Sequence, residues 1–284
     1  MKVFKKVDEL TVELENIREK NLTIGFVPTM GALHMGHLSL VNQASLENDI
    51  VLISIFVNPT QFNNSDDLKN YPRNLEKDLE LLKTHKCDLV FAPGIEEIYP
   101  DENSKKKNFD LGNLSKTMEG KFRPSHFEGV ATVVNRLFEI TKPSKAYFGQ
   151  KDIQQFLIIN KLNENYLKHL NIQLVKCPII REESGLAMSS RNELLDHETR
   201  KNAGLIGKVL MEYKNKYKNY TVSELKSLVV ETINHNPYLK VEYFEIATEP
   251  DLEEVTEWTA GKKIIACIAV FAGNVRLIDN VYFN

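Results

Sequence analysis

The alternation of strand-like and helix-like segments over the first two thirds of the chain limits its possible folds more than any other feature. Short apolar runs typical of strands occur at residues 23–27, 50–57, 88–91, 146–148 and 172–177, and the run 50–57 is almost continuously apolar. Segments with apolar positions at helical spacing separate them, at residues 37–47, 75–82, 127–140 and 153–167. Repeated strand–helix–strand order favours right-handed crossovers. The sequence therefore predicts an α/β fold with a doubly wound, parallel, Rossmann-like sheet.

The pattern changes after Pro178. Two helix-like segments, 196–213 and 222–233, precede three strand-like runs at 241–247, 264–270 and 275–278, and Gly273-Asn274 is a hairpin signal between the last two. Helices followed by antiparallel strands make a separate, smaller α+β domain. A length of 284 residues also favours two domains. We predict domains at residues 1–181 and 182–284.

Charge and cysteine content narrow the classes of partner. The formal net charge of −3 gives no electrostatic reason to expect a nucleic acid or an anionic membrane. Cys87, Cys177 and Cys267 lie far apart and lack metal-ligand spacing, which favours buried thiols in a reducing compartment. The first residues lack the apolar core of a secretory signal. We expect a cytoplasmic protein with no membrane or nucleic-acid partner.

A segment bracketed by glycines follows the first predicted strand, and it reads Pro28-Thr29-Met30-Gly31-Ala32-Leu33-His34-Met35-Gly36-His37. Gly31 and Gly36 permit close approach of the backbone to a phosphate, and the helix expected from His37 would point its free N–H groups at the same place. His34 and His37 can donate hydrogen bonds to oxygens that gain charge during attack on a phosphate. Two ordinary histidines, or a zinc pair, are the alternatives, but no third metal ligand lies nearby in the sequence.

This segment resembles the HxGH signature of the nucleotidylyltransferase and class I aminoacyl-tRNA synthetase superfamily. More narrowly, it resembles the pantothenate synthetase (pantoate–β-alanine ligase) family. The resemblance implies that ATP contacts Met30, Gly31, Ala32, Leu33, His34, Met35, Gly36 and His37. It places His34 and His37 at the α-phosphate, with His37 as proton donor, and Met30 also against pantoate.

Polar residues also follow the strand predicted at 50–57. Asn58 and Gln61 are uncharged groups that both donate and accept hydrogen bonds, and they suit recognition of hydroxyls and carboxylates. An ordinary polar turn fixed by Pro59 is the alternative. The segment resembles the family's FVNPxQF element, which implies that Gln61 binds pantoate and later β-alanine, and that Asn58 lies near the α-phosphate.

The strand predicted at 146–148 leads into Gly149-Gln150-Lys151-Asp152-Ile153-Gln154-Gln155. Lys151 supplies a point charge for a polyphosphate, and Asp152 can accept from ribose hydroxyls or cap the next helix. The segment resembles the family's FGxKDxQQ motif. That resemblance implies that Gly149, Gln150, Lys151 and Asp152 bind ATP, with Lys151 catalytic, and that Gln155 binds pantoate.

A fourth element lies beyond the predicted domain boundary. Ser189, Ser190 and Arg191 can form a phosphate clamp, and they resemble the family's ALSSRN motif with Met188 in place of leucine. The same resemblance assigns Ile180 and Met188 to the ATP pocket, with Ile180 on its adenine side. A lesser match implies that Arg123 and His126 lie at the substrate edge, although Ser125 between them could simply cap a helix.

The resemblance implies an ATP- and Mg²⁺-dependent ligase that activates pantoate as an acyl-adenylate and joins it to β-alanine. Mg²⁺ would be held through the ATP phosphates, the second domain would act as a lid, and the enzyme would be a homodimer. A nucleotidylyltransferase for a phosphorylated acceptor is the nearest alternative. A catalytically silent nucleotide- or RNA-binding protein is the alternative from another class.

Overall fold

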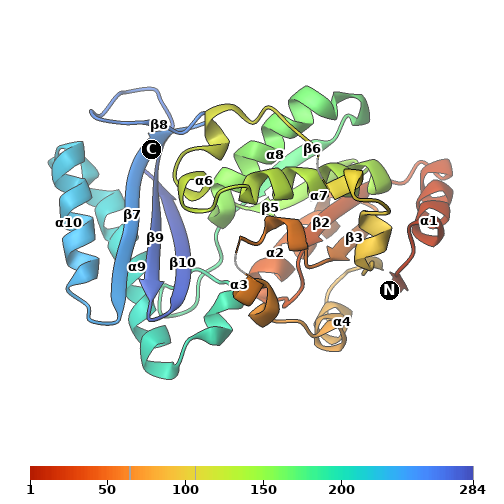
Figure 1. Ribbon diagram of the computed structural model, residues 1–284, viewed down its shortest axis with the longest axis horizontal. Coiled ribbons are helices and arrows are strands. Elements are labelled where there is room, and N and C mark those ends of the chain that lie inside the picture. The colour runs from red at the N-terminus through yellow and green to blue at the C-terminus, as the bar shows by residue number, and fades with distance from the viewer. Residues whose placement is uncertain (64, 106, 284) are drawn as a thin grey trace. The chain divides into compact units, whose positions relative to one another are not determined.

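The computed structural model describes residues 1–63, 65–105 and 107–283. The chain forms two compact units, shown in Figure 1. The first unit contains Met1–Gly149 and Gln155–Cys177, and the second contains Gln150–Gln154 and the chain from Pro178 onwards. The short segment 150–154 therefore groups with the C-terminal part of the chain, although strands of the first unit precede and follow it. No helix in the described ranges is long and apolar enough to cross a membrane.

The first unit is built on six parallel strands in the order β1-β4-β3-β2-β5-β6. Their bounds are β1 (Lys2–Phe4), β2 (Ile24–Thr29), β3 (Ile50–Ile55), β4 (Leu89–Phe91), β5 (Lys145–Gly149) and β6 (Gln173–Cys177). This arrangement confirms the predicted α/β class. β1 was not expected, because a strand of three residues that begins with a lysine carries little strand signal; it pairs with β4 at the edge of the sheet.

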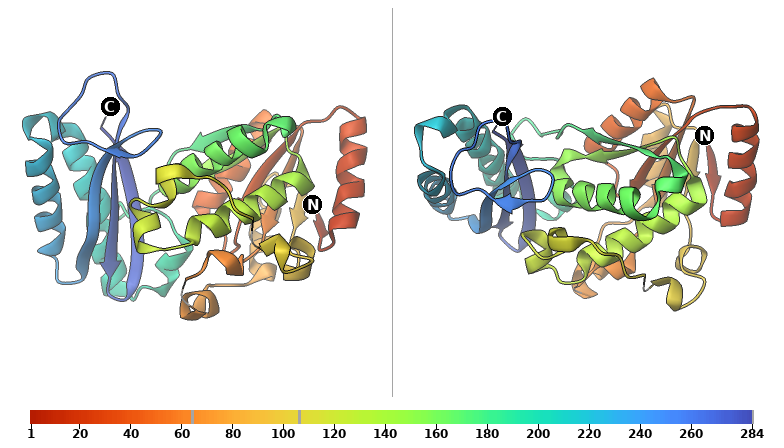
Figure 2. Two further views of the ribbon diagram at one scale, coloured as in Figure 1. Left: turned by 45° about the horizontal axis from the view of Figure 1, so that its top comes forward. Right: turned by 90° about the horizontal axis from the view of Figure 1, so that it is seen from above.

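Helices cover both faces of this sheet, and Figure 2 shows them from two further directions. They are α1 (Val7–Glu19), α2 (Met35–Glu47), α3 (Ser65–Asn70), α4 (Leu75–Lys83), α5 (Ile95–Ile98), α6 (Glu119–Phe122), α7 (His126–Thr141) and α8 (Ile153–Tyr166). Val27 of β2 belongs to a buried cluster with Leu38 of α2 and Leu82 of α4. Its neighbour Phe26 instead meets Phe138 of α7, with ring centroids 6.3 Å apart. Successive strand residues thus face opposite layers, as period-2 geometry requires.

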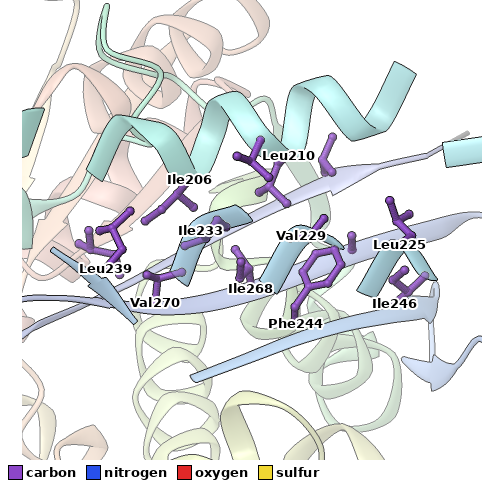
Figure 3. Packing of buried hydrophobic residues seen from close by; sticks show 14 of the residues in the cluster. Ile206, Leu210, Leu225, Val229, Ile233, Leu239, Phe244, Ile246, Ile268 and Val270 are labelled. Carbon is purple, nitrogen blue, oxygen red and sulfur yellow. The ribbon is translucent and has the colours of Figure 1, made fainter. Parts of the chain in front are cut away.

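The second unit is a four-stranded antiparallel sheet in the order β10-β9-β7-β8, with two helices. The elements are α9 (His197–Lys216), α10 (Val222–Asn234), β7 (Leu239–Thr248), β8 (Glu253–Glu254), β9 (Ile264–Ala272) and β10 (Val275–Tyr282). Gly273, at φ +56°, turns β9 into β10, which confirms the predicted hairpin. The helices pack on one face of the sheet around buried aliphatic side chains such as Ile206, Val229 and Ile268 (Figure 3).

The three cysteines are buried, as expected, and none of them forms a disulfide within the described part of the chain. Burial raises the pKa of Cys87 to about 12 and that of Cys177 to about 11. These two thiols are therefore small apolar side chains at physiological pH, because the reactive thiolate forms only far above it.

Candidate active site

The loop between β2 and α2 has a backbone that a carboxylate holds in place. Gly31 and Ala32 have φ values of +81° and +49°, a left-handed conformation that costs energy for alanine. The buried Asp78 of α4 accepts hydrogen bonds from the Ala32 nitrogen at 3.0 Å and the Leu33 nitrogen at 2.7 Å. Two charge-assisted bonds from adjacent amides stabilise the unusual turn. Asp78 thus fixes the path of the backbone immediately before the two histidines.

The two histidines of this loop lie side by side. Helix α2 begins at Met35, two residues before the expected start at His37, because His34 acts as the N-cap. The Nδ1 atom of His34 accepts from the Gly36 nitrogen at 3.1 Å, so a neutral His34 carries its proton on Nε2. The ring centroids of His34 and His37 are 4.1 Å apart. The pair therefore sits in the first turn of a helix, where backbone N–H groups favour an anion.

The segment after β3 forms a buried polar cluster. Asn58 caps the short helix η1 (Pro59–Gln61) by accepting from the Thr60 nitrogen. Its Nδ2 donates to Gln61 Oε1 at 3.1 Å, and Gln61 Nε2 donates to the sulfur of Met30 at 3.1 Å. Met30 and Gln61, expected to share a substrate, are thus in direct contact.

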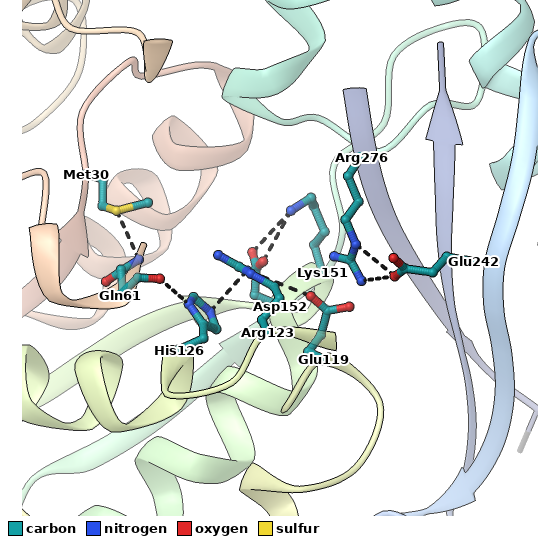
Figure 4. A network of polar contacts seen from close by, with 9 residues as sticks. All are labelled: Met30, Gln61, Glu119, Arg123, His126, Lys151, Asp152, Glu242 and Arg276. Carbon is teal, nitrogen blue, oxygen red and sulfur yellow. Dashed lines mark hydrogen bonds and ion pairs between the residues drawn. The ribbon is translucent and has the colours of Figure 1, made fainter. Parts of the chain in front are cut away.

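His126 and Arg123 join this cluster (Figure 4). His126 Nδ1 lies 2.8 Å from the carbonyl oxygen of Gln61, and its Nε2 lies 3.2 Å from Arg123 Nη1. A carbonyl can only accept and a guanidinium can only donate, so His126 is a neutral ring with its proton on Nδ1. Arg123 also lies 3.8 Å from the carboxylate of Glu119. Ser125 has a left-handed backbone and makes no side-chain cap hydrogen bond, which rules out the capping alternative.

Three adjacent strands position the residues that the first unit contributes. β3, β2 and β5 are neighbours in the sheet, all parallel, so the chain leaves them at the same carboxyl edge. Asn58 follows β3, Met30 follows β2, and Gly149 ends β5. Gln155 lies half-buried in the first turn of α8, the helix that continues from this edge.

The second unit holds Lys151 through a residue of its last strand. Gln150, Lys151 and Asp152 form the short helix η4 (Gln150–Asp152). Asn280 of β10 donates to the carbonyl oxygens of Gln150 and Lys151, both at 2.9 Å, and accepts from Gln150 Nε2 at 3.0 Å. The ammonium of Lys151 lies 3.3 Å from Asp152 (Figure 4). β10 therefore fixes the backbone that carries this lysine.

The remaining candidate ATP residues lie in the same unit. A turn at Gly185 brings Met188 back beside Ile180, with the Met188 nitrogen donating to the Ile180 carbonyl at 2.9 Å. Ser189 caps the helix η6 (Ser190–Leu194) by accepting from the Arg191 nitrogen at 3.3 Å. Both η4 and η6 contact β10. Strand β10 is thus the common support for two loops that are distant in sequence.

A buried ion pair anchors β10 beside these loops. Arg181 makes a bidentate contact with Asp279, at 2.5 and 2.9 Å, and Asp279 is buried. Burial raises the pKa of Asp279, and the guanidinium of Arg181 opposes that shift. The next residue, Asn280, has its backbone nitrogen 2.8 Å from Asp279 Oδ1. The pair therefore also orders the residue that holds η4.

Three supporting residues escaped the sequence reasoning. Asp78 lies in an amphipathic helix, where an acid is typical of a solvated face, and Tyr99 and Asn280 lie outside the recognised motifs. Tyr99 donates to Asn58 at 2.8 Å. A polar residue inside an apolar run, such as Asn280 in β10, is the one local signal that could have been used.

Fold and site together define a class: a doubly wound nucleotide-binding protein whose crossing from β2 to α2 carries an HxGH motif. A sequence model of the pantoate–β-alanine ligase family matches residues 2–282. The chain belongs to the pantoate–β-alanine ligase family, and it is an enzyme of the ligase class.

Individual members of the family match this chain over nearly the whole length of both proteins. The chain is 48% identical to a pantothenate synthetase of Azobacteroides pseudotrichonymphae, covering 100% of both chains. A pantothenate synthetase structure from Thermus thermophilus matches with a TM-score of 0.91 and 39% identity, covering 100% of this chain and 99% of that one. A pantoate–β-alanine ligase from Francisella tularensis, solved with beta-gamma ATP and β-alanine, matches with a TM-score of 0.83 and 35% identity over 100% and 98% of the two chains.

Proposed function

We propose that this ligase makes pantothenate in two half-reactions at the loops described above. In the first, a carboxylate oxygen of pantoate attacks the α-phosphorus of ATP, and the bond to pyrophosphate breaks. In the second, the amine of β-alanine attacks the acyl carbon, AMP leaves, and the amine gives up a proton. Adenylation is needed because a free carboxylate is a poor acyl donor. The observation that carries the proposal is the HxGH loop, held by Asp78 at the carboxyl edge of a parallel sheet.

The residues of the first unit would bind the reacting groups. His34 and His37 would donate to the α-phosphate, with His37 as proton donor, where charge develops during attack. Gln61 and Gln155 would hold pantoate, and Met30, which touches Gln61, would pack against its methyl groups. Asn58 and His126 each hydrogen-bond to Gln61, and Arg123 hydrogen-bonds to His126. These contacts support a role for the three residues in shaping the pantoate site.

The residues of the second unit would bind the nucleotide tail. Lys151, Ser189, Ser190 and Arg191 would hold the β- and γ-phosphates. Mg²⁺ would bind through phosphate oxygens, which suits an ion that prefers oxygen ligands and keeps several waters. The ion would neutralise charge on the leaving pyrophosphate. The second unit would act as a lid that excludes water from the labile adenylate.

Product analysis tests the reaction. Mass spectrometry of mixtures containing ATP, Mg²⁺ and pantoate should show pyrophosphate and an enzyme-bound adenylate without β-alanine, and AMP with pantothenate when β-alanine is added. AMP transfer that never becomes amine-dependent would instead indicate a nucleotidylyltransferase. Replacing Mg²⁺ with a chelator should abolish pyrophosphate release.

Three further parts of the proposal have separate tests. Hydrogen exchange of residues 188–191 should slow at saturating ATP–Mg²⁺ if the lid closes, and indifference of that loop would contradict closure. Light scattering should give twice the 32.6 kDa chain mass if the enzyme is a homodimer. Cell fractionation should find the protein in the cytoplasm.

A further inference from the structure

Asn58 can take only one amide orientation. Its Oδ1 accepts from the Thr60 nitrogen at 3.3 Å, the Thr60 hydroxyl at 2.9 Å and the Tyr99 hydroxyl at 2.8 Å. Its Nδ2 donates to Gln61 Oε1 and to the Gly129 carbonyl, both at 3.1 Å. A reversed amide would set its NH₂ group against a backbone N–H and its oxygen against a backbone carbonyl. Asn58 is only 1% exposed, so water cannot relieve either conflict.

This orientation is passed on to Gln61. Because Asn58 offers a donor, Gln61 must turn its Oε1 toward Asn58 and its Nε2 away from it. Within the described part of the chain, Nε2 has one protein partner, the sulfur of Met30, which is a weak acceptor. On the side that faces Met30, Gln61 therefore presents its NH₂ group, which has a second hydrogen available for donation, and not its amide oxygen.

Tyr99, which lies outside the loop, reinforces this polarity by donating to the same oxygen. Its side chain is 4% exposed, and burial raises its pKa to about 12, so the hydroxyl keeps its proton at physiological pH. The Oδ1 atom of Asn58 can only accept, which directs that proton at it. Tyr99 follows α5 and is 41 residues from Asn58 in sequence, so this contact depends on the fold of the whole unit and not on the local turn.

We propose that Tyr99 is a positioning residue: it stabilises the amide orientation that the Thr60 nitrogen and the Gly129 carbonyl impose on Asn58, and through Asn58 the polarity of Gln61, so that Gln61 recognises an acceptor oxygen of pantoate. The inference rests on the proposed function, in which Gln61 holds pantoate, and it adds the direction of the hydrogen bond and a residue that stabilises it. A carboxylate has only acceptor oxygens, so a reversed Gln61 would repel it.

The first test is a double-mutant cycle in the full-length enzyme. Tyr99→Phe keeps the ring and removes the hydroxyl, and it should lower kcat/KM for pantoate about fivefold to tenfold, the scale of one hydrogen bond, with KM for ATP unchanged. Added to Gln61→Ala, it should have no further effect, because both changes act through the same amide. Additive losses would overturn the proposal. A Gln61→Ala enzyme with unchanged KM for pantoate would instead remove the proposed role of Gln61 itself.

Tyr147→Phe is the matched control. It removes another buried tyrosine hydroxyl of the first unit, bonded to Asn48 at 2.6 Å and Glu47 at 3.1 Å, away from this cluster. KM for pantoate should not change in this control, and an equal loss in both variants would refute the relay. If Tyr99→Phe fails to fold, Thr60→Val removes the other hydroxyl donor to the same oxygen and carries the same prediction.

The second test reverses the polarity directly. Gln61→Glu keeps the shape but replaces the donor by an oxygen, so the loss in kcat/KM for pantoate should exceed that of Gln61→Ala. Relative to the wild type at each pH, activity should recover as the pH falls and the carboxylate gains a proton that it can donate. A Gln61→Glu enzyme with near wild-type kcat/KM would show that this side of Gln61 need not donate.

Discussion

Replacing Asp78 by asparagine tests whether the left-handed loop needs its carboxylate. The single oxygen of the new amide can still accept from the nitrogen of Ala32 or Leu33. Its NH₂ group then faces the other backbone N–H, donor against donor. One hydrogen bond to a charged group is lost and the other becomes neutral, a total of about 3 kcal/mol. That free energy corresponds to a factor of roughly 100 in the population of the native loop.

The loss divides between two measurable quantities. If the loop stays ordered until the protein unfolds, Tm should fall by roughly 6 °C or more, at about 2 °C per kcal/mol for a large domain. If the loop is released locally, kcat/KM for ATP should fall by up to about 100-fold with little change in Tm. Differential scanning fluorimetry and a pyrophosphate-release assay on the same sample measure both.

Asp49→Asn is the control for this experiment. The exposed carboxylate of Asp49 also accepts two hydrogen bonds, from the nitrogen and hydroxyl of Thr23 at 2.8 and 2.7 Å, and both residues lie at the ends of β2 and α2 that are opposite to the HxGH loop. Because its environment is solvated, its substitution should change neither quantity greatly. An Asp78→Asn enzyme that keeps both the Tm and the ATP kinetics of the wild type would refute the assigned role of Asp78.

Other contacts lead to three shorter predictions. Gly129→Ala would place a Cβ atom against the backbone of Thr60, so KM for pantoate should rise and Tm should fall; unchanged values in a thermal scan and steady-state assay would contradict this close approach. Asn280→Ala removes two hydrogen bonds to the backbone of η4, so KM for ATP should rise about tenfold with KM for pantoate unchanged, as steady-state kinetics can show. Hydrogen bonds from Thr199 lower the pKa of Asp196, so its capping contribution is present above about pH 3.9 and is lost as the pH falls through the lowered value. Urea unfolding should therefore show that the free energy of unfolding of Asp196→Ser falls less below about pH 4 than that of the wild type. An equal fall in both proteins would exclude protonation of this cap as a cause.

Local signals were enough to predict most of the fold. The buried strands β2 to β6 and the helices α2, α4, α7 and α8 follow from short apolar runs and helical spacing, because each element must bury a defined face. The Gly273-Asn274 turn likewise requires only a residue that tolerates positive φ. The first strand and helix were missed, since Lys2–Phe4 and Val7–Glu19 are short or highly charged and acquire their structure from pairing with β4 and packing on the unit.

The sequence allowed predictions for the candidate site only where the chain carries a motif. Residues such as His37 and Lys151 lie in runs with recognisable glycines and spacing. Asp78, Tyr99 and Asn280 support those runs from distant parts of the chain, and nothing in their immediate sequence specifies which loop they contact. The hydrogen-bond direction of an amide depends on all its neighbours at once, which no linear pattern contains.

The grouping of residues 150–154 with the second unit has a consequence for chimeric enzymes. The polypeptide passes between the two units three times, after Gly149, after Gln154 and after Cys177. A hybrid that exchanges only the chain from Pro178 onwards would join the lysine-bearing segment of one parent to the last strand of the other. Functional recombination within this family should therefore require that the five-residue insert travel together with the C-terminal module, as a matched pair.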